Sequence, residues 1–243
     1  MFLDKEGFPL PTLSIVIPIY NERDTWQKLV QRVEAVDLGA VKRQLVLVDD
    51  CSSDGTRAQL EEFAASRPDA VVKFHPVNAG KGAALRTGFA SATGDFVIDQ
   101  DADLEYDPAD YPALLEPLLA GQADVVFGSR FLVKPKEKGY AQNYLANKIL
   151  TWLSNLTTGL HLTDMETCYK VFRREVLGRL KLEQDRFGFE PEVTAKLAAL
   201  GVRIVERPIR YAPRTVAEGK KIKLKDGFNA IKCIWKYRPK KKS

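Results

Sequence analysis

The feature that most limits the fold of this 243-residue chain is the alternation of short apolar runs with helical patterns through its first half. The apolar runs predict strands over residues 13–18, 44–49, 71–75, 96–99 and 123–129. The segments between them predict helices over residues 25–36, 56–66, 81–92 and 108–120. Strands of this kind, separated by helices, are typical of βαβ units. We therefore expect an α/β fold with a mostly parallel central sheet and helices on both faces.

The second half of the chain is less regular. Helical patterns cover residues 143–156, 190–200 and 225–237, and strands are predicted over residues 167–172 and 203–207. A length of 243 residues suits one large domain with a short appendage. We expect a domain over residues 1–215, followed by a basic amphipathic C-terminal segment over residues 216–243.

The charge is unevenly distributed, although the whole chain carries only +5. Residues 214–243 contain eleven Lys or Arg against two acidic residues, so the rest of the chain is net negative. A basic end on an acidic body favours an anionic partner: a membrane surface, phosphate or nucleic acid.

Cysteine use and hydropathy exclude several classes of protein. The three cysteines form no CxxC pair and the two histidines lie far apart, which argues against disulfides or a zinc site and favours a reducing compartment. Asp4 and Glu6 stand where a signal peptide would be basic, and no run of about 18 apolar residues exists. We expect a cytoplasmic protein without a spanning helix.

Polar clusters follow three of the predicted strands. They are Pro18-Ile19-Tyr20-Asn21-Glu22, residues 49–56 (DDCSSDGT), and Asp99-Gln100-Asp101-Ala102-Asp103. A single such turn could merely cap the next helix. Ligands bind beyond the carboxyl ends of parallel strands, however, so three clusters at one edge favour a binding site.

Asp101 and Asp103 form the chemical centre of this predicted site. Two carboxylates one residue apart at a strand end can offer oxygen ligands to Mg²⁺ or Mn²⁺, with a diphosphate supplying the others. A solvated acidic turn is the plainer interpretation. It is less favoured because Asp99 and Glu105 add like charge that something must balance.

The segment Asn78-Ala79-Gly80-Lys81-Gly82 opens a predicted helix and leaves two interpretations open. Its backbone N–H groups and Lys81 could bind a phosphate, although it is not a P-loop. Its glycines could equally serve a tightly packed start of the helix. His75 is expected to be a strand-end residue, and Cys51 and Cys168 to be inert.

The ordered motifs resemble family 2 glycosyltransferases, and among them the dolichyl- or polyprenyl-phosphate mannose and glucose synthases. The resemblance spans residues 13–215. It rests on Ile17-Pro18-x-Tyr20-Asn21-Glu22, Val48-Asp49-Asp50-x-Ser52-x-Asp54-Gly55-Thr56, Asn78-x-Gly80-Lys81-Gly82, residues 99–108 (DQDADLEYDP) and Gly128-Ser129-Arg130.

The resemblance implies a glycosyltransferase-A fold and an inverting reaction without a covalent intermediate. It implies a nucleoside site at Pro18, Tyr20, Glu22, Val48 and Asp50. Asp101 and Asp103 would bind the metal and, with Arg130, act in catalysis. The remaining expected donor-binding residues are Lys81, Ala102, Glu105, Lys170 and Arg214. The donor is expected to be GDP-mannose or UDP-glucose.

The acceptor that the resemblance implies is a polyprenyl or dolichyl phosphate, whose oxygen is already anionic and needs no strong base. A hydroxyl acceptor, on a soluble molecule or a polysaccharide, would need one, and Asp164 or Glu166 could serve. Many relatives carry C-terminal transmembrane helices that this sequence lacks. We therefore expect a peripheral protein at the inner face of the membrane, held by the helix around residues 149–156 and the basic tail, or by a separate membrane protein. Core packing and a solvated charge run are the plainer interpretations of these two segments.

Two other classes compete with this interpretation. A sugar-nucleotide pyrophosphorylase would need a Gly- and Arg-rich loop after the first strand, where this chain has Pro18-Ile19-Tyr20-Asn21-Glu22. A non-enzymatic nucleotide or nucleic-acid binder would explain the basic tail but not the acidic strand ends, which repel phosphate unless a metal is bound. We therefore expect no nucleic-acid partner.

Overall fold

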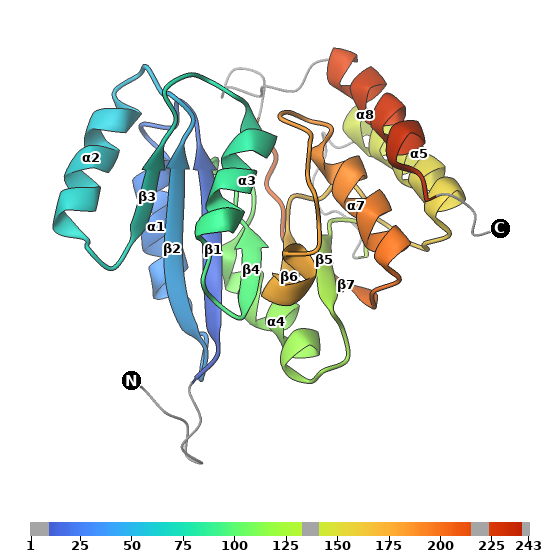
Figure 1. Ribbon diagram of the computed structural model, residues 1–243, viewed down its shortest axis with the longest axis horizontal. Coiled ribbons are helices and arrows are strands. Elements are labelled where there is room, and N and C mark those ends of the chain that lie inside the picture. The colour runs from blue at the N-terminus through green and yellow to red at the C-terminus, as the bar shows by residue number, and fades with distance from the viewer. Residues whose placement is uncertain (1–9, 133–140, 215–223, 240–243) are drawn as a thin grey trace.

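The computed structural model describes residues 10–132, 141–214 and 224–239, with side chains omitted for residues 141–143 and 224–226. Within these residues, one sheet has the strand order β3-β2-β1-β4-β6-β5-β7 (Figure 1). Its strands are β1 (Thr12–Ile19), β2 (Lys42–Asp49), β3 (Val71–Phe74), β4 (Phe96–Asp99), β5 (Val125–Ser129), β6 (Lys170–Arg173) and β7 (Ile204–Pro208). All the predicted strands are present, with ends shifted by up to three residues.

One strand runs against the others. β1 pairs in parallel with β2 and β4, β2 with β3, and β5 with β7, whereas β6 is antiparallel to both of its neighbours, β4 and β5. The predicted mostly parallel sheet is therefore confirmed. Because β6 is reversed, the residues that precede it lie at the edge where β4 and β5 end.

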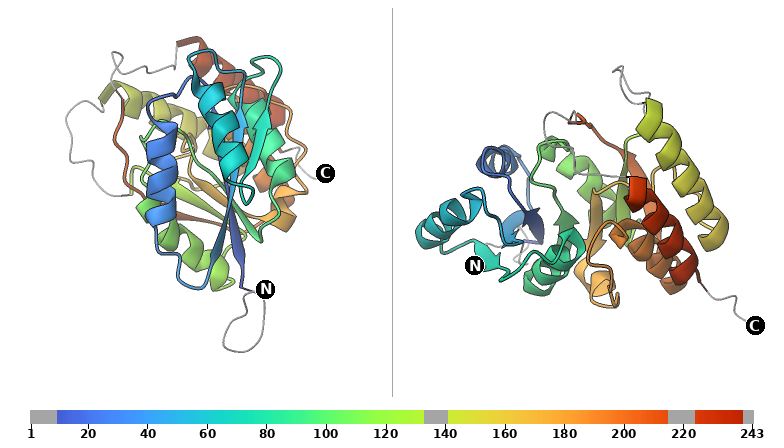
Figure 2. Two further views of the ribbon diagram at one scale, coloured as in Figure 1. Left: turned by 90° about the vertical axis from the view of Figure 1, so that its left-hand side faces the viewer. Right: turned by 90° about the horizontal axis from the view of Figure 1, so that it is seen from above.

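Helices cover both faces of the sheet, as predicted (Figures 1 and 2). They are α1 (Trp26–Ala35), α2 (Thr56–Ser66), α3 (Lys81–Ser91), α4 (Tyr111–Leu119), α5 (Ala141–Thr158), α6 (Arg174–Leu177), α7 (Phe189–Leu200) and α8 (Leu224–Tyr237). The helix predicted over residues 108–120 divides into a 3-10 turn, η1 (Pro108–Asp110), and α4. The short α6 was not predicted.

Two apolar cores result from the alternation of side chains along the buried strands. Ile15 and Ile17 of β1 face one core, which α1, α2 and α4 complete. Val16 faces the other core, to which α3, α5, α6, α7 and α8 contribute. A strand that is buried on both faces reads as a continuous apolar run, which is why periodicity two is not visible in β1.

α8 is part of the second core. Its Ala230, Cys233 and Ile234 are about 2% exposed, and the helix packs on α5 and α7. The predicted amphipathic helix in this region is confirmed. The predicted boundary near residue 215 and the terminal Lys240-Lys241-Lys242 lie outside the described residues, so the division into two segments stays a prediction. Among the described helices, none has the length and apolar character needed to span a bilayer.

Candidate functional site at the carboxyl edge of the sheet

The loops that follow β1, β2 and β4 carry unusual backbone conformations. Asn21, Cys51 and Leu104 have φ values of 53°, 62° and 65°, and they are the non-glycine residues with positive φ in the described part of the chain. Such conformations cost energy and cluster at functional sites. Asn21 and Cys51 lie in two of the three polar clusters that the sequence identified, and Leu104 directly follows the third.

The first two loops are fastened to each other by hydrogen bonds. The Ser53 N–H donates to the Asn21 Oδ1 at 2.8 Å, and the Asn21 N–H donates to the Ser52 Oγ at 3.0 Å. The Glu22 N–H donates to the Thr56 Oγ1 at 3.1 Å. Pro18 pairs with Val48 on adjacent strands directly beneath these loops. Tyr20, 38% exposed, stands at the surface of the same loop.

Asp50 is held by a fixed set of partners. Its carboxylate accepts hydrogen bonds from the Ala79 N–H at 2.9 Å and the Gly80 N–H at 2.7 Å, and it lies 2.8 Å from Nδ1 of His75. His75 Nε2 in turn lies 2.9 Å from the Thr87 hydroxyl. Asp50 therefore joins the β2 loop to the start of α3, and His75 is its neighbour at the end of β3, as expected of a strand-end residue.

The glycine-rich start of α3 is shaped by close packing. A Cβ at Gly82 would lie 2.2 Å from the Gln184 carbonyl oxygen, and one at Gly80, where φ is 99°, would lie 2.4 Å from that of Asp185. The Ala83 N–H donates to the same Asp185 oxygen. Since Asp50 and Asp185 engage these N–H groups, the geometry favours the packing interpretation of this segment over a backbone phosphate cradle.

The side chain of Lys81, in contrast, reaches into the acidic centre. Its Nζ lies 2.7 Å from Asp101 Oδ1, 3.7 Å from Glu190 Oε1 and 3.8 Å from Asp99 Oδ2. Burial works against this ammonium group, but Asp101 and Asp99 outweigh burial and hold the pKa of Lys81 well above its ordinary value. Lys81 is thus a built-in counter-charge for three carboxylates.

The carboxylates at this centre outnumber the positive charge that Lys81 supplies. Asp99 is 1% exposed, and neither of its carboxylate oxygens has a hydrogen-bond partner in the structure. Burial, and then Asp101, raise the pKa of Asp99 well above its ordinary value even though Lys81 is near. Burial, Asp101 and Glu105 likewise raise the pKa of Asp103 to about 7. Carboxylates placed in this way fit a divalent cation.

The described residues do not form a complete metal site on their own, since no group of three or more His, Cys, Asp or Glu side chains is arranged to bind an ion. Asp101 and Asp103 flank the buried Ala102, which is 3% exposed. A cation at this pair would need further oxygen ligands from a bound molecule. Mg²⁺ commonly binds in this way, through one or two carboxylates together with substrate phosphates.

Arg214 connects the acidic centre to the first loop. Its Nε donates to the Asp103 carbonyl oxygen at 2.7 Å, and its Nη2 lies 2.8 Å from Glu22 Oε2. Glu105 accepts a hydrogen bond from the Arg214 N–H at 2.8 Å and another from the Tyr211 hydroxyl at 2.5 Å. Residues almost 200 positions apart in the sequence therefore form one wall of the site.

Arg130 and Asp164 form a buried ion pair. The guanidinium binds both carboxylate oxygens at 2.7 Å, and the Arg130 N–H also donates to Asp164 at 3.0 Å. Their side chains are 8% and 0% exposed. A carboxylate with three donors is poorly placed to accept a proton. The hypothesis that Asp164 could act as a base is therefore not favoured by this geometry.

Glu166 and Lys170 complete the interior of the cluster. The Glu166 Oε1 is buried without a hydrogen-bond partner, and burial, followed by Glu190, raises the pKa of Glu166 to about 8. Lys170 is 1% exposed, donates to the Thr167 carbonyl oxygen and lies over the ring of Phe127. Burial lowers the pKa of Lys170 below its ordinary value.

Sequence reasoning missed two members of this cluster. Glu190, 5% exposed, sits in the first turn of α7, where an acidic residue would be explained by the helix dipole alone. Cys168, expected to be inert, has its Sγ 3.1 Å from the Lys81 Nζ. Burial raises the pKa of Cys168 well above its ordinary value, so its thiol stays protonated. Glu166 and Lys170, two candidate site residues that lie two positions before and after Cys168, were the sequence signal that could have identified Cys168 as part of the cluster.

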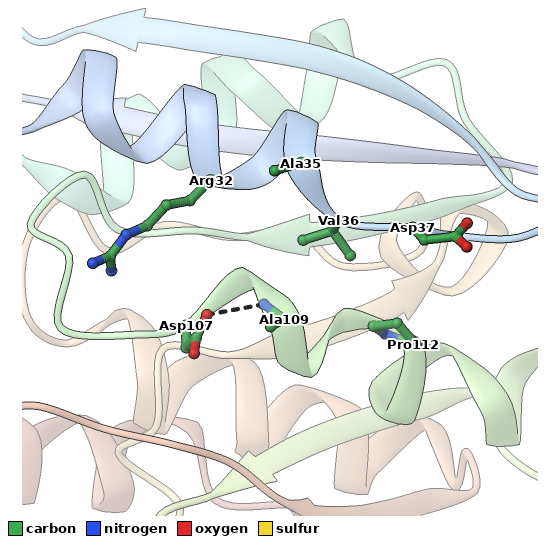
Figure 3. Close-up of a pocket in the computed structure, with 7 residues that line it drawn as sticks. All are labelled: Arg32, Ala35, Val36, Asp37, Asp107, Ala109 and Pro112. Atoms are coloured by element: carbon green, nitrogen blue, oxygen red, sulfur yellow. Dashed lines mark hydrogen bonds between the residues drawn. The ribbon is translucent and has the colours of Figure 1, made fainter.

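A separate hollow of about 590 Å³ lies elsewhere on the molecule, between the end of α1 and the η1 turn (Figure 3). It is lined by Arg32, Ala35, Val36, Asp37, Asp107, Ala109 and Pro112. None of the predicted site residues lines it. The site is therefore assigned by the convergence of charged side chains and not by the size of a cavity.

The chain is similar in sequence to a known protein family and to several characterised proteins. The profile of Glycosyl transferase family 2 matches residues 14–181. The undecaprenyl-phosphate mannosyltransferase of Micrococcus luteus is 32% identical over 216 residues, which cover 84% of this chain and 85% of the relative. The polyprenol monophosphomannose synthase of Mycolicibacterium smegmatis is 30% identical, with 87% and 82% covered.

Other relatives are longer, and the solved structures are more distant. The undecaprenyl-phosphate 4-deoxy-4-formamido-L-arabinose transferase of Klebsiella pneumoniae subsp. pneumoniae is 30% identical over 87% of this chain, which spans 63% of that protein. The glucosyl-3-phosphoglycerate synthase of Mycobacterium tuberculosis, crystallised with Mn²⁺, UDP and phosphoglyceric acid, superposes with a TM-score of 0.70. Its sequence is 23% identical, and 93% of this chain and 78% of that chain are covered, so this likeness concerns the fold alone.

Proposed function

Since the chain belongs to glycosyl transferase family 2, we propose that it transfers a sugar from a nucleotide-diphosphate donor to a polyprenyl phosphate. The glycosyltransferase-A fold that the resemblance implied is confirmed. Relatives named for the transfer of mannose to undecaprenyl phosphate or polyprenol support a lipid phosphate acceptor. GDP-mannose and UDP-glucose are the two donors to test first.

The observation that carries the proposal is the acidic centre at the carboxyl edge of the sheet, whose negative charge exceeds what Lys81 balances. Asp101 and Asp103 would hold Mg²⁺ or Mn²⁺ there. Relatives in fold were crystallised with Mn²⁺ or Mg²⁺ and UDP, which supports a divalent ion. When bound, the ion supplies positive charge to the diphosphate leaving group.

The remaining predicted residues would bind different parts of the donor. Pro18, Tyr20, Glu22, Val48 and Asp50 would bind the nucleoside, because they come from the last residues of the paired strands β1 and β2 and from the loops that follow them. Lys81, Ala102, Glu105, Arg130, Lys170 and Arg214 would surround the diphosphate and sugar. Lys81, Arg130 and Arg214 are held by carboxylates before the substrate arrives, and Lys170 is held by the Thr167 carbonyl oxygen, so all four are oriented in advance.

The choice of acceptor rests on the relatives named for polyprenyl phosphates and on the state of Asp164 and Glu166, the two carboxylates considered as bases. A phosphate monoester oxygen is already anionic and can attack the anomeric carbon in a single displacement, which would invert the configuration there. A hydroxyl acceptor would need a base. Asp164 is bound by Arg130, and Glu166, with its pKa raised to about 8, holds its proton at neutral pH.

The location follows from the acceptor. A lipid phosphate lies at the bilayer surface, so we propose that the protein works there as a peripheral protein on the inner face of the membrane. Lys and Arg in and around α8 would favour anionic lipid. Attachment through a separate membrane protein is the alternative, and binding of the purified protein to anionic vesicles distinguishes the two.

The test is transfer from labelled GDP-mannose or UDP-glucose to a short-chain polyprenyl phosphate, with the corresponding polyprenol as the matched acceptor. We expect Mn²⁺-dependent transfer to the phosphate and none to the alcohol. A thermal-shift series with each donor should identify the preferred nucleotide, because binding to the native state raises its apparent stability. Transfer to the alcohol but not to the phosphate would refute the proposal.

A further inference from the structure

α5 presents an apolar stripe to solvent. Leu145, Ile149, Trp152 and Leu156 are 62%, 48%, 62% and 66% exposed. Their spacing of four, three and four residues places them on one side of the helix. Monomeric soluble proteins rarely expose a contiguous patch of such large apolar side chains, and patches of this kind mark contact surfaces.

α8 extends this surface. It packs beside α5, as Figure 1 and the right view of Figure 2 show, and it exposes Phe228 at 75% and Trp235 at 49% while its other side is buried in the second core. We call the exposed sides of these two helices the α5–α8 face. It is not a loose tail, because both helices are anchored in the same core.

The basic side chains on and around this face indicate an anionic partner. The sequence of α5 contains Lys148 and no acidic residue. Lys232 and Arg238 are exposed on or just after α8, and Lys236 is 50% exposed but pairs with Glu183 at 3.0 Å. Large apolar side chains bordered by lysines and tryptophans are the composition of helices that lie in the headgroup region of anionic bilayers.

The face is continuous with the proposed catalytic site. The ring of Phe131, next to Arg130, packs edge-on against Tyr144 of α5 at 5.0 Å between centroids. The Lys148 ammonium lies over the Phe131 ring and donates to the Thr163 carbonyl oxygen at 3.2 Å, one residue before Asp164. The first half of α5 is thus attached to the loops that hold the Arg130–Asp164 pair.

We propose that the α5–α8 face docks on an anionic lipid bilayer, with the α5 stripe inserted at headgroup level and the site brought next to acceptor phosphates in that layer. This inference rests on the proposed function, since it names the surface through which the lipid acceptor is reached. A second copy of this chain and a membrane protein are the other possible occupants, and the test separates them from the bilayer.

The decisive variant is Trp152→Glu combined with Leu156→Glu, which places charge in the stripe without touching the buried side of α5. Leu119→Glu is the matched control, because Leu119 is 49% exposed on α4, on the opposite face of the sheet. Lys232→Glu tests the charge contribution. Point substitutions are preferred to deletion of the C-terminal segment, because removing α8 would uncover the second core.

The measurement is co-sedimentation of the full chain with phosphatidylglycerol/phosphatidylcholine vesicles, and with phosphatidylcholine alone, at low and high salt. We expect the wild type and Leu119→Glu to bind anionic vesicles equally. The double variant should bind at least tenfold more weakly, and Lys232→Glu several-fold more weakly at low salt only. Equal binding by the double variant and the control, or no binding by the wild type, would overturn the proposal.

Two further readouts separate the outcomes. If the double variant changes the oligomeric state in gel filtration while vesicle binding is unchanged, the face joins two copies and the proposal fails. Transfer to a short-chain polyprenyl phosphate without vesicles should be the same in all variants. If the wild type does not catalyse this transfer, the proposed function is refuted. The vesicle result would still show whether the α5–α8 face binds anionic lipid.

Discussion

Replacing Lys81 by methionine tests how the acidic centre is balanced. The ammonium lies within 3.8 Å of carboxylate oxygens of Asp101, Glu190 and Asp99; Asp99 and Glu190 are buried, and the side chains of Asp101 and Lys81 are each 18% exposed. Removing one partner from a buried ion pair costs about 3–5 kcal/mol. We expect the lower end, about 3 kcal/mol, because an unbalanced carboxylate can take up a proton and so limit the loss.

For a chain of this length a change of 1 kcal/mol shifts Tm by about 2–4 °C, so the variant should unfold roughly 6–12 °C lower in the presence of EDTA. Mn²⁺ should then raise the Tm of the variant more than that of the wild type, because the ion becomes the main remaining counter-charge. Differential scanning fluorimetry at matched pH measures both effects without depending on activity.

The control for this prediction is Arg203→Met. Arg203 binds Asp124 through two of its guanidinium nitrogens, but its side chain is 58% exposed, and exposed pairs contribute only about 0–1 kcal/mol. If Lys81→Met loses no more stability than this control, the carboxylates are already neutral and Lys81 is not their counter-charge. The same conclusion would follow from a Mn²⁺ response equal to that of the wild type.

Three other substitutions test single groups of the site. Asp103→Asn should abolish Mn²⁺-dependent transfer. The control is Asp107→Asn, which changes the carboxylate at the cap of η1 and should leave transfer intact. Full turnover of Asp103→Asn would remove Asp103 from the metal site. Asp50→Ala should weaken nucleoside diphosphate binding in calorimetry and also lower the free energy of unfolding by about 1–3 kcal/mol, because two backbone N–H groups lose their acceptor. Unchanged values in both measurements would contradict it. Glu166→Gln should match the wild type in stability near pH 4.5 and exceed it by about 1 kcal/mol or more at pH 8. The wild type has a folded-state pKa raised to about 8, so the stability that it gains from the protonated carboxyl is lost as pH rises from 4.5 to 8. Parallel stability curves for the two proteins would refute this assignment.

The sequence predicted the elements of the first half of the fold well, because each strand there is followed by its own helix, as in βαβ units. It did not predict where the second-half strands insert. Nothing in the residues of β6 or β7 encodes the order β4-β6-β5-β7 or the reversal of β6. Those pairings depend on the shape of the whole sheet, which local periodicity does not contain.

The site shows the same division. Asp50, Asp101 and Asp103 follow their strands directly, so a topological rule finds them. Glu190 and Cys168 reach the cluster only through the packing of α7 and the reversed β6. Asp50 was predicted only as a nucleoside-binding residue, whereas the structure shows that two backbone donors also depend on its carboxylate.

The burial of α8 in the second core also bears on how the chain is made. During synthesis the N-terminal part of a domain emerges first, so α8 leaves the ribosome after the other helices of the second core. Until it docks, the sides of α5 and α7 that receive Ala230 and Ile234 stay uncovered. A nascent chain that stalls before α8 emerges therefore leaves these apolar sides exposed, and we expect that form to be prone to aggregate or to be bound by a chaperone.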